Sequence, residues 1–164
     1  MQLQKRIQQL DQEVEEQVQQ RAQARRLLTH PGVGPVTALA TDVFLGDPSR
    51  FATGNQVASY IGMIPSERTS GKRQRLGKMS KQGNALLRYL WTEAAMSTVR
   101  KDPELQGFYR RKLIQKGMGK ARIAAARKLG IRLWIMMRDQ IDYQEFCRRG
   151  KLRQTGETHA GMPA

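Results

Sequence analysis

The sequence predicts a mainly α fold, in which an N-terminal coiled-coil-like helix precedes a compact helical domain with a helix-hairpin-helix-like turn. Two observations predict it. Apolar residues recur at three- and four-residue spacing over several long segments, and Pro and Gly interrupt these segments at only a few points. At 164 residues the chain has room for one domain with an appended arm. A hydrophobic share of 39% suffices for a core but indicates that part of the chain is extended or poorly packed.

The charge balance indicates nucleic acid as the partner. There are 29 Lys and Arg against 14 Asp and Glu, a net charge of +15. An anionic membrane surface is the weaker alternative, because no long basic helix with an aromatic face appears. Cys147 is the only cysteine, so the chain has no internal disulfide and no cysteine-based zinc site. We expect a cytoplasmic protein.

Residues 1–28 predict the arm, a single helix of about 25 residues. It contains no Gly or Pro, and a 4-3-4 apolar spacing follows the a/d rhythm of a coiled coil: Leu3, Ile7, Leu10 and Val14. The rhythm fails at Gln17 and Arg21, so the seam alone would form only a weak dimer. We expect a homo-oligomer through this helix; packing of the helix on its own domain is the open alternative.

Next comes a turn between two predicted helices, Pro31-Gly32-Val33-Gly34-Pro35. Pro31 ends the first helix, and Pro35 occupies the first turn of the next, where proline is tolerated. Gly32 and Gly34 bracket the turn, which leaves the amides at the new helix N-terminus free to meet an anion. The pattern resembles the helix-hairpin-helix turn that grips DNA phosphates, and a purely structural turn remains the alternative. We interpret His30 as a loop residue.

The compact domain is expected to span 29–149, followed by a disordered tail at 150–164. Further helices are predicted at 55–60, from near Asn84 to Arg100, from an Asp102-Pro103-Glu104 start to about 115, and at 121–138. Apolar residues of the second and fourth face a core. The tail has three glycines, one proline and little that is apolar.

Residues 66–83 predict a basic, glycine-rich loop. A backbone rich in glycine can approach a polyanion closely, and the cations would neutralise phosphates. The candidate phosphate-binding residues are Lys72, Arg73, Arg75, Lys78, Lys81 and, just beyond, Arg88. By chemistry alone the candidate nucleophiles are Ser66, Thr69, Ser70 and Ser80.

The acidic residues predict no metal site in this chain, and no cofactor is expected within it. Clustered carboxylates would be needed to hold a divalent cation, whereas the acids here are scattered. We interpret Glu67 and Glu93 as ordinary salt-bridge partners.

Several of these motifs occur together, in order, in one known family. They are Pro31-Gly32-Val33-Gly34-Pro35, then Phe51, then Ala58-Ser59-Tyr60-Ile61-Gly62-Met63-Ile64-Pro65, then Ser70-Gly71, then Lys78-Met79-Ser80-Lys81-Gln82-Gly83-Asn84-Ala85-Leu86-Leu87-Arg88. The succession closely resembles the C-terminal, serine-bearing domain (Transposase_20 type) of insertion-sequence transposases that also carry an RNase H-like DEDD domain. The resemblance covers roughly residues 20–145.

The resemblance implies a specific chemistry. The family's serine lies in a Ser-Gly step, here Ser70-Gly71, and joins covalently to a DNA strand end. A carboxylate-bound divalent metal, Mg²⁺, in the DEDD domain completes the site, and a structured guide (bridge) RNA directs recombination. Ser80 is then more simply a helix cap.

The chain departs from the family in lacking the DEDD acids, and it opens in what resembles the linker between the two domains. We therefore expect it to be inactive alone and to require the DEDD domain. The alternatives are a non-catalytic helix-hairpin-helix DNA-binding module and an RNA-binding scaffold.

Overall fold

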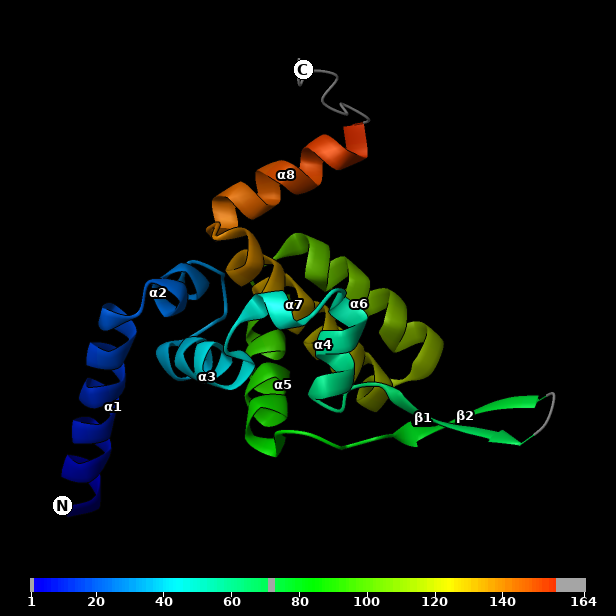
Figure 1. Cartoon of the computed structure of the whole chain (residues 1–164), viewed down its shortest axis with the longest axis horizontal. Coiled ribbons are helices and arrows are strands. Elements are labelled where there is room, and N and C mark those ends of the chain that lie inside the picture. Colours follow the sequence, from blue (N-terminus) through cyan, green and yellow to red (C-terminus); the bar gives the residue numbers. More distant parts are fainter. Residues whose placement is uncertain (1, 71–72, 156–164) are drawn as a thin grey trace.

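The computed structural model describes residues 2–70 and 73–155 and has a helical body with projecting elements (Figure 1). The mainly α prediction is confirmed, with one β-hairpin as the exception. The elements are α1 (Gln2–Gln20), α2 (Ala22–Leu28), α3 (Pro35–Leu45), η1 (Pro48–Arg50), α4 (Gly54–Tyr60), β1 (Pro65–Ser70), β2 (Arg73–Met79), α5 (Ala85–Val99), α6 (Pro103–Lys116), α7 (Met118–Asp139) and α8 (Tyr143–Thr155). No helix in the described part of the chain is long and apolar enough to cross a bilayer.

The core is organised around Trp91 of α5. Its indole packs on Gly130 of α7 so closely that a Cβ at position 130 would lie 2.0 Å from the ring. Its Nε1 donates a hydrogen bond of 2.9 Å to Oγ1 of Thr41 in α3. Trp91 thus joins three helices, and around it lie buried apolar side chains that the sequence assigned to the core, including Leu87, Leu129 and Leu133. Leu86, also expected there, is exposed.

The single helix predicted for residues 1–28 is wrong, because the chain leaves the helical conformation at Arg21. The break separates α1 from α2. Val18 of α1 and Leu27 of α2 are both buried, yet nine residues at about 100° each would point them to opposite sides of one straight helix. Breaking the helix lets both reach the body. Helix α2 therefore packs on the body through Ala24 and Leu27, and Arg21 pairs with Asp42 at 3.2 Å.

The predicted starts of α5 and α6 are confirmed by their caps. Oδ1 of Asn84 accepts from the Leu87 amide at 2.9 Å, and Oδ1 of Asp102 accepts from the Leu105 amide at 2.6 Å. These side chains satisfy amides that have no partner within the helix. Asn84 therefore caps α5, and the expectation that Ser80 does so is wrong.

The C-terminal helix α8 was not predicted. The sequence did carry a signal for it, since Oδ1 of Asp142 accepts from the amide of Glu145 at 2.9 Å in a cap-like arrangement. The tail expected to be disordered from residue 150 is helical through Thr155, and residues 156–164 lie outside the described part. The helix continues because Arg148 and Arg149 pair with Glu145 across its first turns.

A buried ionic cluster fastens α6, α7 and α8 together. Arg132 lies 3.0 Å from Asp102 and 2.9 Å from Glu104, and the Tyr143 hydroxyl donates to Asp102. Burial raises the pKa of Asp102, but the hydrogen bonds from Tyr143 and the Leu105 amide, together with Arg132, outweigh it and lower the pKa below its usual value.

His30 packs against Tyr143 of this cluster. It belongs to a loop, as predicted, yet only 1% of it is exposed. Its Nδ1 is 3.1 Å from the Pro31 carbonyl oxygen, and its ring centroid is 4.5 Å from that of Tyr143. Burial lowers the pKa of His30 to about 4, so the ring is neutral at pH 7.

Gly130→Ala should destabilise the protein by about 1–3 kcal/mol, because the new methyl group must displace Trp91 from a packed core. The matched control is Gly119→Ala in the same helix, where nothing lies within 4 Å of the new Cβ. Urea unfolding of both variants measures the difference. Equal stabilities would contradict the tight packing of Trp91 on α7.

The neutral state of His30 predicts a stability that falls with acid. The unfolded chain, with a histidine pKa near 6.5, binds more protons than the folded chain between pH 6.5 and 4. The contribution of neutral His30 to the free energy of unfolding is fully present above pH 6.5, and about 2 kcal/mol of it is lost between pH 7 and pH 5. Urea unfolding at these two pH values should show that loss in the wild type and not in His30→Gln. An equal loss in the variant would assign the acid sensitivity to other groups.

Candidate nucleic-acid interface

The segment predicted as a basic loop is instead an antiparallel β-hairpin that projects from the body (Figure 1). Strands β1 and β2 pair from Pro65 opposite Met79 to Ser70 opposite Arg73, with a register shift between Pro65 and Glu67. Ser70 therefore ends β1 at the free end of the hairpin. At about 3.4 Å per residue, it lies about 17 Å along the strand from Pro65.

The sequence held a hairpin signal that its basic composition obscured. Two residues, Gly71 and Lys72, separate the paired Ser70 and Arg73, and a two-residue connection that opens with glycine favours a hairpin. Both lie outside the described residues. The strands contain few of the residues that favour strands, and a lone two-stranded hairpin is marginally stable. Its base must therefore be held by the body.

Two glycines hold that base. A Cβ on Gly62 would lie 1.8 Å from the Gln82 carbonyl oxygen, and one on Gly83 would lie 2.1 Å from the Tyr60 carbonyl oxygen. Both glycines have positive φ, 76° and 99°. The end of α4 thus meets the chain that leaves β2, backbone against backbone. We call this contact the glycine clamp.

Hydrogen bonds complete the glycine clamp. The Lys81 amide donates to the Gly62 carbonyl at 3.2 Å, and the Ser80 amide donates to the Ile64 carbonyl at 2.9 Å. Nη1 of Arg88 donates to the Ile61 carbonyl at 2.9 Å. Arg88, predicted to bind phosphate, is therefore engaged in fastening α5 to the clamp, whereas Lys81 is exposed at the base of the hairpin.

The remaining candidate cations of the hairpin lie along β2. The backbone of Arg73 is opposite Ser70, and Arg75 is opposite Arg68. Lys78 lies nearer the base, one residue before Met79. The hairpin thus brings the predicted serine and several of the predicted cations onto one projecting ribbon, and the glycine clamp fixes its origin.

The turn before α3 has the predicted form, with Pro35 as the first helical residue. The role of Gly32 is packing, because its φ is 88° and a Cβ there would lie 2.5 Å from the Thr98 amide nitrogen of α5. Oγ1 of Thr98 also donates to the Pro31 carbonyl at 2.8 Å. Gly34 is exposed, with open space where a side chain would be, so its backbone is accessible.

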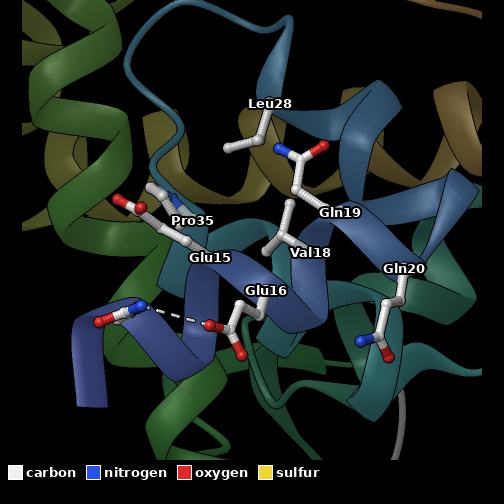
Figure 2. A pocket seen from close by; sticks show the side chains of 8 residues that line it. Glu15, Glu16, Val18, Gln19, Gln20, Leu28 and Pro35 are labelled. Atoms are coloured by element: carbon white, nitrogen blue, oxygen red, sulfur yellow. Dashed lines mark hydrogen bonds between the residues drawn. The ribbon is translucent and has the colours of Figure 1, made fainter. Parts of the chain in front are cut away.

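An open groove of 710 Å³ flanks this turn on the side of α1 (Figure 2). Glu15 and Glu16 contribute its acidic side chains, and Figure 2 shows Glu15 directed toward Pro35. Carboxylates repel phosphates, so this side of the turn is unsuited to a nucleic-acid backbone.

The described residues contain no group of three or more His, Cys, Asp or Glu side chains that could hold a metal ion. Two described acids outside the arm form ion pairs: Glu93 pairs with Arg122 at 3.3 Å, as predicted, and Glu104 pairs with Lys128 at 2.8 Å. These residues do not fit a Mg²⁺ site.

Gly83→Ala should loosen the hairpin, because a methyl group cannot fit against the Tyr60 carbonyl. The control Gly46→Ala also has positive φ, 62°, but has open space around the new Cβ. The control should lose about 1–3 kcal/mol, because its φ of 62° and ψ of −131° form a backbone conformation that residues other than glycine rarely adopt. Gly83→Ala should lose more, and the amides of the opposed residues Arg68 and Arg75 should exchange hydrogen faster. Equal effects of the two substitutions would argue against the clamp.

The sequence of this chain is similar to those of known transposases. Residues 24–110 match the model of the Transposase IS116/IS110/IS902 family. A probable family 20 transposase of Pseudomonas aeruginosa is 37% identical over 98 residues, which cover 60% of this chain and 29% of that protein. The transposase for insertion sequence element IS1111A of Coxiella burnetii is 31% identical over 124 residues, 73% of this chain and 34% of that protein.

The chain thus spans about a third of the length of these curated relatives. The matched segment contains the turn before α3, the glycine clamp and the whole hairpin, and it makes up more than half of the chain. The chain belongs to the Transposase IS116/IS110/IS902 family.

Proposed function

We propose that this chain is the DNA-binding, serine-bearing part of a transposase and that Ser70 supplies the nucleophile for DNA strand cleavage and joining. One observation supports the proposal above the others. Ser70 ends a strand at the free end of a basic hairpin, and the two motifs that flank it in sequence form the glycine clamp at the hairpin's base. A rigid base with a projecting tip suits a group that must reach a substrate outside its own domain.

The proposed step is a transesterification. The Ser70 hydroxyl oxygen forms a bond to a backbone phosphorus, and the bond from that phosphorus to one sugar oxygen breaks. The serine proton passes to a base, and the departing sugar oxygen takes up a proton. Cations such as Arg73 and Arg75 would stabilise the charge that develops on the phosphate.

The groups that would activate the serine belong outside this chain in the proposal. The described residues offer no metal site, and the relatives are about three times as long as the matched segment. We propose that a DEDD domain, on the same protein or on a partner, completes the site with Mg²⁺ and that a guide RNA directs it. The exposed apolar seam of α1, formed by Leu3, Ile7 and Leu10, supports a homo-oligomer through that helix.

A non-catalytic DNA-binding module is the second candidate. The exposed Gly34 at the start of α3 favours it, since a backbone open to solvent at a helix N-terminus can meet a phosphate without any nucleophile. Glu15 and Glu16 of the groove would confine such a contact to the side of the turn away from α1. The two candidates differ in whether the Ser70 hydroxyl is needed.

Ser70→Ala should abolish covalent attachment to DNA while leaving duplex affinity within about twofold, because one hydroxyl contributes little to a contact made mainly by charges. The assay mixes the chain with the DEDD domain of a full-length relative, labelled duplex DNA carrying that relative's element end, its guide RNA and Mg²⁺. Adducts are detected on a denaturing gel.

The matched controls are Ser66→Ala and Ser80→Ala, which should retain the adduct. An adduct that survives Ser70→Ala and disappears in Ser80→Ala would show that Ser80, and not Ser70, is the nucleophile. DNA affinity without any adduct from the reconstituted pair would favour the non-catalytic module.

A further inference from the structure

We propose that the corner between α6 and α7 is a second surface for the backbone of duplex DNA, separate from the hairpin. The surface, which we call the basic corner, lies around the turn between the two helices. Lys116 and Lys120 flank this turn, and the exposed Arg110 and Arg111 precede it by about one to two turns of α6. The inference rests on the proposed DNA binding of this chain and adds a second contact to it. Three of the four residues lie beyond position 110, where the match to the family model ends.

The charged residues around the basic corner are all positive. Residues 105–138 contain ten Lys and Arg and no Asp or Glu. Three of the cations farther along α7 are neutralised by acids from other elements, since Arg122, Lys128 and Arg132 each form a salt bridge. In the described part of the chain, no carboxylate lies within salt-bridge distance of the four residues of the basic corner. Their charge is therefore available to an external polyanion.

The basic corner also projects from the body. Every residue from 113 to 120 is exposed, including Ile114 at 87% and Met118 at 65%. Nothing lies within 4 Å of where a Cβ would be on Gly117 or Gly119. A phosphate backbone can therefore approach the corner without a steric barrier.

The chemistry of the basic corner favours the backbone of a duplex over other partners. Single-stranded nucleic acid is held largely by aromatic stacking, and the nearby ring of Phe108 is occupied by Lys112 and Lys128, whose Nζ atoms lie 5.6 and 4.8 Å from its centroid. A protein partner would need a larger apolar area than the exposed side chains of Leu113, Ile114 and Met118 offer. In Figure 1 the corner and the hairpin lie on the side of the body away from α1, and we expect one duplex to contact both.

The test compares two double substitutions that remove the same charge. Lys116→Gln with Lys120→Gln neutralises the corner, and Arg100→Gln with Lys101→Gln neutralises exposed cations at the opposite end of α6. Duplex affinity of the 164-residue chain is measured between 50 and 300 mM salt. The corner variant should reduce the slope of log K against log salt by about 1.8, which corresponds to two phosphate contacts, and should weaken binding at least tenfold at 0.1 M. The control variant should change neither the salt slope nor the affinity at 0.1 M.

A second measurement locates the DNA directly. In a Cys147→Ser background, a DNA-cleaving chelate attached to Met118→Cys should cut the bound duplex, whereas the same reagent on Arg100→Cys should not. Circular dichroism checks that the variants fold. If the slope of log K against log salt is unchanged in the corner variant while the wild type still binds DNA, the proposal that the basic corner binds DNA is wrong, and the proposed function is unaffected.

Three other results would also overturn the inference. Equal losses of duplex affinity in both double variants would show that the affinity depends on the net charge of the chain and not on the basic corner. A larger loss for single-stranded DNA or RNA than for duplex DNA would assign the corner to a different ligand. Failure of the wild type to bind duplex DNA in a salt-dependent way would remove the DNA-binding proposal together with the corner.

Discussion

The arrangement of the body depends on the contact between Trp91 and Gly130. A residue larger than glycine at position 130 would keep the indole out of the space between α5 and α7. The indole nitrogen, which would otherwise be a buried polar group without a partner, donates to Thr41 of α3. One side chain therefore sets the separation of α5 from α7 and the position of α3 relative to both. The turn before α3 and the start of α5 both depend on these positions.

The glycine clamp extends this order from the body to the hairpin. Gly62 follows α4, and Gly83 precedes the cap of α5, so the clamp joins elements that the core already holds in place. Arg88 ties the first turn of α5 to the Ile61 carbonyl beside the clamp. This explains why family motifs rich in glycine lie at the base of the hairpin. They are needed for a close backbone contact, and the contact gives a marginally stable ribbon a fixed origin.

Charge is distributed unevenly over the molecule. Acids of α1 line the groove beside Pro35, whereas the hairpin and the corner between α6 and α7 are basic. Carboxylates elsewhere are used internally, as in the pairs of Asp102 and Glu104 with Arg132, so they do not offset the exposed cations of the corner. A polyanion would be repelled near Glu15 and attracted to the opposite side.

The sequence by itself determined the helical class, the starts of α3, α5 and α6, and the segment that carries Ser70. These features depend on local chemistry, such as a proline at a first helical turn or an Asn84 side chain that caps its own helix. Only the tertiary structure decided the break at Arg21, the burial of His30, the packing role of Gly32 and the engagement of Arg88. The break lets Val18 and Leu27 both reach the body, and His30, Gly32 and Arg88 depend on partners far away in the sequence, Tyr143, Thr98 and Ile61, respectively. The hairpin belongs partly to each group. Its two-residue turn is a local signal, but its stability requires the glycine clamp. The clamp joins distant segments, and local periodicity contains no information about such contacts.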